Sequence, residues 1–232
     1  MAGKFIKGAL VQFMETFIAP LPNVIIFQFN PETITHTWSP AQDVAGAGAG
    51  EDVSPLAVQG PPGESFNFTL LMDATDQIAE KNPLAITTGI YSRIAALEML
   101  LYPTNSFPDG LLGSVSAPKE APGGAADPGP KRDVPQSEVS TVLFIWGPAR
   151  ILPVRVTSLT INEKFHDPLL NPTHAEAQIG LRVLTPRELR ASNDELADIA
   201  RGAYAYTLGA RQVFAIANLA NAVESIVGMI PI

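Results

Sequence analysis

The sequence contains no cysteine, which excludes disulfide bonds, thiolate metal sites and a cysteine nucleophile. Charge is also scarce, since only 16% of the 232 residues are charged and 15 are basic. Nucleic-acid binding requires clustered Lys and Arg that neutralise phosphates. The sequence has no such cluster and its formal net charge is −8, so we expect no nucleic-acid partner.

Long apolar runs are missing as well. Residues 1–7 lack the apolar core of a signal peptide. The uncharged run between Arg211 and Glu224 is about 12 residues, below the roughly 18 that a membrane-spanning helix needs. Its polar face carries no basic residues that would favour binding to a membrane surface. Membrane contact is therefore not expected, and we predict assembly in the cytoplasm.

Hydrophobic residues, by contrast, make up 46% of the chain, enough to bury a substantial core. With only 16% charged residues, the chain has few charged side chains to place on its solvent-exposed surface. This composition favours a protein whose surface is partly covered by partners.

Alternation of apolar and polar residues predicts that most of the chain is β-strand. In the first strand, Phe5, Ala9, Val11 and Phe13 are expected on one side. A change of face near Thr157 and Ser158 predicts a β-bulge in the longest strand. The predicted strands cover residues 4–13, 23–30, 32–38, 66–72, 139–147, 151–165 and 174–184.

Two segments interrupt this pattern. Residues 41–63, which include AGAGAG, are predicted to form a long loop that becomes ordered against a neighbouring subunit. Residues 103–137 are rich in Pro and Gly and are predicted to be a mobile insertion. Between them, residues 82–102 have helical periodicity, with Asn82 as N-cap and Pro83 at the first position.

The C-terminal part of the chain is predicted to be helical. Thr185 and Glu188 form a capping-box pattern, and residues 192–195 form a second one. Apolar residues then recur at three- and four-residue steps from 196 to 230, and Gly202 and Gly209 are points where this segment could divide. This stripe could pack on the chain's own sheet or on another subunit. Its candidate interface residues are Val213, Ile216, Leu219 and Val223.

The pattern as a whole predicts an α+β protein that is mainly β. We expect an antiparallel β-barrel or sandwich with one packed helix and a C-terminal helical extension. The predicted domains are 1–185, which contains the insertion at 103–137, and 186–232.

The sequence offers no catalytic, cofactor or metal site. It contains no G-x-S-x-G nucleophile motif. His166 and His174 flank one predicted turn, but Asp167 is the only acid close to them, so a solvated turn is favoured over a metal site. His36 lies on the polar side of its strand and is expected at the surface or at an interface.

Several segments together resemble the contractile injection system tube-protein family, whose members are tube and baseplate components of phage-tail-like particles. The segments are FQFNPE from Phe27, SFNFTLLMD from Ser65, LFIWG from Leu143, and the block 154–185. The residues that carry the resemblance are Phe27, Phe29, Asn30, Pro31, Phe66, Phe68, Trp146 and Gly147.

The resemblance implies a tube-like β-domain that assembles as a homohexameric ring between the spike or hub protein and the inner tube. Many relatives carry a LysM module after this domain, whereas this chain has the helical segment 186–232 instead. We therefore expect a structural tube-initiator or baseplate hub protein without enzymatic activity. Its partners would be spike, tube and other baseplate proteins, in a particle that is later released or docked on a membrane.

The loop residues Gln59 and Gly60 are further candidates for the contact between subunits. Two alternatives stay open at this point. One is a peripheral membrane anchor that acts through residues 196–232, and the other is a β-sandwich hydrolase.

Overall fold

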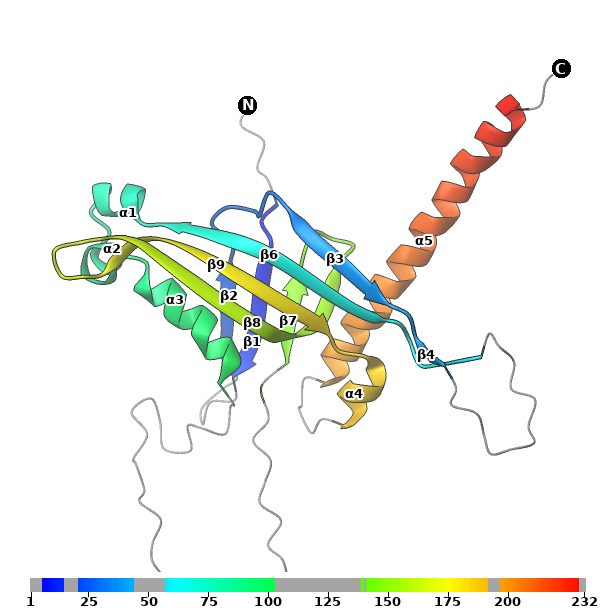
Figure 1. Cartoon of the computed structure of the whole chain (residues 1–232), viewed down its shortest axis with the longest axis horizontal. Helices are drawn as coiled ribbons and strands as arrows, with labels where there is room; N and C mark the ends of the chain where they lie inside the picture. The colour runs from blue at the N-terminus through cyan, green and yellow to red at the C-terminus, as the bar shows by residue number, and fades with distance from the viewer. Residues whose placement is uncertain are drawn as a thin grey trace, which may run out of the picture.

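A seven-stranded antiparallel sheet forms the centre of the computed structural model, which describes residues 6–14, 21–43, 57–102, 139, 141–191 and 197–229 (Figure 1). The strand order is β2-β1-β7-β8-β9-β6-β3. The prediction of an α+β, mainly β, fold is confirmed. The bounds of these strands are β1 Ala9–Met14, β2 Leu21–Ile26, β3 Ile34–Ser39, β6 Gly63–Asp73, β7 Val142–Ile145, β8 Ile151–His166 and β9 Pro172–Val183.

The predicted alternation is clearest in β6. Phe66, Phe68, Leu70 and Met72 are all buried, and the residues between them are more exposed. β7, which is apolar on both sides, lies between β1 and β8 as expected of a central strand. The predicted bulge is also present, because the pairing of β8 with β9 shifts register between Val156 and Ser158.

The sheet curls around an aromatic core. The rings of Phe27 and Phe68 lie 5.6 Å apart, and those of Phe66 and Phe144 lie 5.2 Å apart. Gln28 donates from Nε2 to the carbonyl of Asp73 over 2.9 Å and accepts from the Asp73 amide over 3.0 Å. These bonds tie the chain after β2 to the end of β6, although the two strands are far apart in the strand order. The sheet therefore bends back on itself.

The helix predicted for residues 82–102 is broken into shorter elements. These are α2 Pro83–Thr88, α3 Tyr91–Glu98 and the 3₁₀ turn η1 Met99–Leu101, and they follow α1 Thr75–Ala79. Asn82 caps α2 as predicted, accepting from the amide of Leu84 over 3.0 Å. The break occurs at Gly89, which has φ +57 and where an added Cβ would lie 2.2 Å from the Pro172 carbonyl oxygen. The close approach of that carbonyl explains the break.

One face of β1 is buried and includes a polar residue. Leu10 and Gln12 are buried, whereas Ala9 and Val11 are only partly so. Gln12 donates to the carbonyl of Met99 in η1 over 3.4 Å and accepts from Asn23 over 3.4 Å. A polar residue can occupy this inner face because the ends of neighbouring elements satisfy its amide.

The predicted loop at 41–63 is partly strand, since β4 Gln42–Asp43 pairs with β5 Val58–Gln59 and β6 begins at Gly63. Residues 44–56 between them lie outside the described residues, as do the whole insertion predicted at 103–137 and the second capping box at 192–195.

Two helices complete the chain. The capping box is confirmed at α4 Pro186–Ala191, where Glu188 accepts from the Thr185 amide over 2.8 Å. The helix α5 spans Ala197–Met229 without the break anticipated at Gly202 or Gly209. It runs from beside β8 away from the sheet (Figure 1). Within the described residues, no helix has a stretch both long and apolar enough to cross a lipid bilayer.

Candidate interaction surfaces

The turn between β8 and β9 is held in one shape by Asp167. The amides of Leu169 and Asn171 donate to Oδ1 of Asp167 over 2.7 and 2.8 Å, and the Asn171 side chain donates to Oδ2 over 2.9 Å. The backbone of Asp167 also accepts from the amide of Leu170 and donates to the carbonyl of Asn171. The hydrogen bond from the Asn171 side chain and those from the two backbone amides hold the pKa of Asp167 below its ordinary value of 3.8.

This rigid turn presents apolar side chains to solvent. Phe165, Leu169 and Leu170 are 76%, 76% and 80% exposed. Phe165 and Leu170 have positive φ angles of 51 and 66, which are uncommon for residues with large side chains. Strained backbone that the surrounding hydrogen bonds keep in place, together with exposed apolar groups, is typical of a binding surface. We call Phe165, Leu169 and Leu170 the hairpin tip.

The first half of α5 is anchored to the sheet by polar contacts. Thr207 is fully buried, and its hydroxyl donates to the Ile151 carbonyl over 2.7 Å and accepts from the Ile151 amide over 3.0 Å. Tyr206 donates to the Pro148 carbonyl over 2.9 Å. These bonds fix α5 beside the start of β8.

The last anchoring contact is an ion pair between α5 and β6. Arg211 donates from Nη1 to Oε2 of Glu64 over 2.9 Å and from Nη2 to Oε1. The Glu64 side chain is only 3% exposed and also contacts His36 Nε2 at 2.8 Å. The guanidinium lies 4.8 Å from the ring centre of Trp38, a cation–π contact. The buried Glu64 carboxylate is therefore paired with the Arg211 guanidinium, which the Trp38 ring also contacts.

His36 was expected at the surface or at an interface, and it belongs instead to this half-buried cluster. Its ring stacks on Phe66 with centroids 4.3 Å apart. Burial is the main influence on the pKa of His36 and lowers it below 6.5, against the opposing effect of Glu64. Burial likewise raises the pKa of Tyr204 above 10.0.

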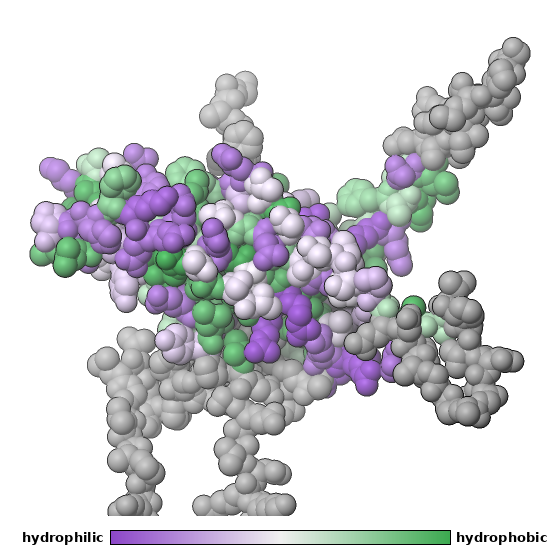
Figure 2. Space-filling model, in the orientation of Figure 1, coloured by the Kyte–Doolittle hydropathy of each residue, from purple (hydrophilic) through white to green (hydrophobic). Residues whose placement is uncertain are grey.

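From Gln212 to Leu219, every residue of α5 is exposed, including the apolar ones. Figure 2 shows these apolar residues where the helix leaves the sheet. Four large side chains here are 62–69% exposed: Val213, Phe214, Ile216 and Leu219. Three of them were predicted interface residues. The fourth predicted residue of the stripe, Val223, is helical, but its side chain lies outside the described ones.

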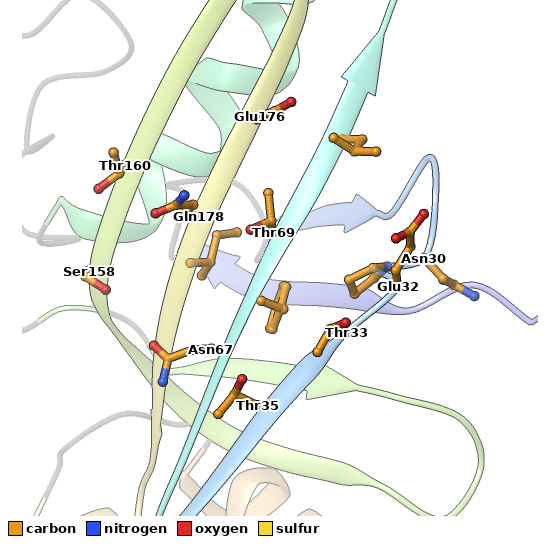
Figure 3. A pocket seen from close by; sticks show the side chains of 14 residues that line it. Asn30, Glu32, Thr33, Thr35, Asn67, Thr69, Ser158, Thr160, Glu176 and Gln178 are labelled. Atoms are coloured by element: carbon orange, nitrogen blue, oxygen red, sulfur yellow. The ribbon is translucent and has the colours of Figure 1, made fainter.

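A shallow polar groove of about 600 Å³ lies on the outer face of the sheet (Figure 3). Its walls come from β3, β6, β8, β9 and the segment before β3, and they carry hydroxyl, amide and carboxylate groups. None of the lining residues is a histidine, lysine or arginine. The polar lining residues are Asn30, Glu32, Thr33, Thr35, Asn67, Thr69, Ser158, Thr160, Glu176 and Gln178.

The groove therefore offers hydrogen-bond donors and acceptors.

Across the described part of the chain, no three His, Asp or Glu side chains are grouped so that they could hold a metal ion. His166 and His174 pair with different acids, Glu163 at 3.6 Å and Asp73 at 3.5 Å.

The residues that carry the family resemblance have different roles. Asn30 joins the segment after β2 to the start of the chain, because its Oδ1 accepts from the Gly8 amide and its Nδ2 donates to the Ile6 carbonyl, both over 2.9 Å. Phe29 is 49% exposed, because β2 ends at Ile26 and the chain bends there. Pro31 lines the polar groove.

The other resemblance residues belong to the interior or to a turn. Gly147 has φ +73 and forms the turn after β7. Trp146 is partly buried against the core, and the fully enclosed ones are Phe27, Phe66 and Phe68. The loop candidates Gln59 and Gly60 are exposed, and Gly60 has φ +82.

Sequence reasoning missed the hairpin tip and the pair of Glu64 and Arg211. The signal for the tip was present, because Leu169 and Leu170 stand between two turn-forming pairs, Asp-Pro and Asn-Pro. No local signal indicates the ion pair, whose members are 147 residues apart.

Comparison of the chain with models of protein families finds no match. Comparison with curated proteins likewise finds no similar sequence.

Proposed function

We propose that this protein is a structural subunit of a phage-tail-like contractile injection particle. It forms part of the baseplate, as the ring that joins the spike or hub protein to the inner tube, and it catalyses no reaction. The motifs from Phe27, Ser65 and Leu143 support this assignment because their order along the chain resembles that of tube proteins.

The hairpin tip is the observation that carries the proposal. Covering a Leu or Phe side chain is worth about 1.5–3 kcal/mol. A turn that is fixed by Asp167 loses little further entropy when a partner covers it. The tip therefore suits a permanent protein–protein contact, in which preformed apolar groups enter a recess of a neighbouring subunit.

The ends of the sheet support the same reading. β2 and β3 are the terminal strands in the order of the described sheet. On β2, Val24 and Ile26 are 48% and 63% exposed. Terminal strands with apolar residues bind other chains readily. A head-to-tail contact that repeats around a closed rotation produces a ring, which is six-fold in the family that the sequence resembles.

The test is co-expression of the chain with the spike, tube and baseplate proteins encoded beside it. We expect them to co-purify, and we expect electron microscopy of the product to show rings. Replacing the tip by Phe165→Ser, Leu169→Ser and Leu170→Ser should abolish this assembly while circular dichroism stays unchanged.

Leu84→Ser, at an exposed apolar position of α2, is the matched control and should assemble normally. A chain that remains monomeric at high concentration and binds none of these proteins would overturn the proposed function.

A further inference from the structure

The two sides of α5 differ in what they contact. One side holds the buried residues Ala197, Ala200 and Thr207 and ends at Arg211, and it packs on the sheet. With 3.6 residues per turn, the residues on the opposite side point away from the sheet. This second side, the heptad face, consists of Gly202, Tyr206, Gly209, Val213 and Ile216, and of these Tyr206 also reaches the turn after β7, where its hydroxyl donates to the Pro148 carbonyl.

The spacing within the heptad face is that of a coiled coil. Its residues follow one another in steps of four, three, four and three. The same steps continue in the sequence of α5 with Ala220, Val223 and Val227. A strict seven-residue repeat keeps one stripe of a helix facing a partner helix along its length. From Gly209 to Ile216, the described part of the chain offers this repeat no partner of its own.

The two glycines point to the same conclusion. Gly202 and Gly209 are seven residues apart, and a Cβ added to either would meet no atom within 4 Å. Glycine weakens the interior of a helix relative to alanine. Packing within the described chain gives no reason for glycine at these positions. The close approach of a second helix would provide one.

The charge of this segment indicates what covers it. From Gln212 to Met229 the only charged residue is Glu224. Identical helices with so little charge do not repel one another. The segment carries no Lys or Arg that would favour an anionic lipid surface. It also lacks the rows of charged residues that select a different partner helix in a mixed coiled coil.

We propose that the heptad face of α5 packs against the same face of α5 in other copies of the chain, as a parallel bundle of more than two helices. The number of helices in the bundle follows from Val213 and Ile216, because β-branched residues at both core positions of the repeat favour coiled coils of more than two helices. Leu219, exposed beside this face, widens the contact as such a bundle requires.

This proposal rests on the proposed function, because a ring places the copies side by side with their helices parallel. The part of α5 beyond Arg211 spans about 27 Å, and an isolated helix of that length is marginal in water. Linking the helices to one ring raises their effective concentration and makes the bundle stable.

The absence of cysteine allows a direct test in the full-length chain. Ile216→Cys places a thiol on the heptad face, and Asn218→Cys places one at another exposed position off it. In assembled rings under mild oxidation, we expect about tenfold more disulfide-linked dimer from Ile216→Cys, because a disulfide needs Cβ atoms about 4 Å apart.

A second variant pair tests the contact by disrupting it. In a Val213→Cys background, Ile216→Asp should reduce cross-linking about tenfold, whereas Asn218→Asp should leave it unchanged, since only the first places a charge inside the bundle. Equal effects of the two substitutions would overturn the proposal.

The outcomes separate this proposal from the proposed function. Rings that form without preferential cross-linking at Ile216 would overturn the bundle and leave the proposed function intact. A chain that forms neither rings nor cross-links would overturn both. Sedimentation of the chain with anionic phospholipid vesicles, without cross-linking, would assign the heptad face to a lipid surface and would also overturn the bundle.

Discussion

Arg211 of α5 binds both carboxylate oxygens of Glu64 in β6, across 147 residues of sequence. The Glu64 carboxylate is 3% exposed and the Arg211 side chain is 30% exposed. A buried carboxylate is costly unless a cation and hydrogen-bond donors surround it. The pair therefore fixes α5 to β6 at Arg211.

Removing Arg211 should destabilise the protein more than removing another arginine of the same helix. Arg211→Ala leaves the buried Glu64 carboxylate without its cation and should cost about 3 kcal/mol. Arg201→Ala is the matched control, because Arg201 pairs with the 81% exposed Asp198, and it should cost less than about 1 kcal/mol. Urea unfolding measures both. Equal losses would mean that α5 is held by other contacts.

His36 should make the stability depend on pH near neutrality. Burial lowers the pKa of His36 below its unfolded value of 6.5, so the unfolded chain binds the proton more tightly. The free energy of unfolding is therefore highest above pH 6.5 and falls as the pH drops from there towards the lower pKa of the folded state.

Urea unfolding between about pH 7 and pH 5 checks this, and His36→Gln should reduce the slope. Asp73, whose pKa is lowered mainly by hydrogen bonds from Thr75, contributes its own loss only below pH 3.8. The pH ranges over which His36 and Asp73 reduce the stability are therefore separate. An NMR titration that places the pKa of His36 above 6.5 would contradict the prediction.

Asn30 should be required in full, as donor and as acceptor. Asn30→Ala removes the bonds to the Gly8 amide and the Ile6 carbonyl and should cost about 1–2 kcal/mol. Asn30→Asp keeps an acceptor for the Gly8 amide but turns a carboxylate oxygen towards the Ile6 carbonyl oxygen, so it should cost at least as much as Asn30→Ala. Thermal unfolding of the two variants gives the order, and a neutral Asn30→Ala would show that this bridge contributes nothing.

The aromatic core should respond according to burial. Phe144 is fully buried between Phe66 and Phe68, and Phe144→Ala should cost about 4 kcal/mol. Trp146 stacks on Phe144 at 6.3 Å but is only partly buried, and Trp146→Ala should cost about 2 kcal/mol. Chemical denaturation of both variants tests the ranking, and the reverse order would mean that Trp146 is the central residue of the core.

Local patterns predicted the strands well where one face is buried. The alternation in β6 and the bulge near Ser158 are both present, because side-chain periodicity reports directly on which face meets the core. On β1, the periodicity did not identify the buried polar residue. There Gln12 is buried through bonds to Met99 and Asn23, two partners that only the tertiary fold brings near.

The helices show where local signals compete with tertiary contacts. Gly89 interrupts the predicted helix because the Pro172 carbonyl lies against it, whereas Gly202 and Gly209 leave α5 unbroken because nothing approaches them. Glycine alone does not distinguish these outcomes. Among the candidate interface residues, Val213, Ile216 and Leu219 are exposed, as expected of a contact surface. The hairpin tip, by contrast, is recognised only in the folded structure.

Because α5 is fixed at its base and extends some 27 Å past Arg211, it acts as a lever. A tilt of about 10° at the Glu64 contact would carry its far end sideways by about 5 Å, which is close to the length of one helical turn. Small rearrangements of the sheet would therefore be magnified at the far end of α5.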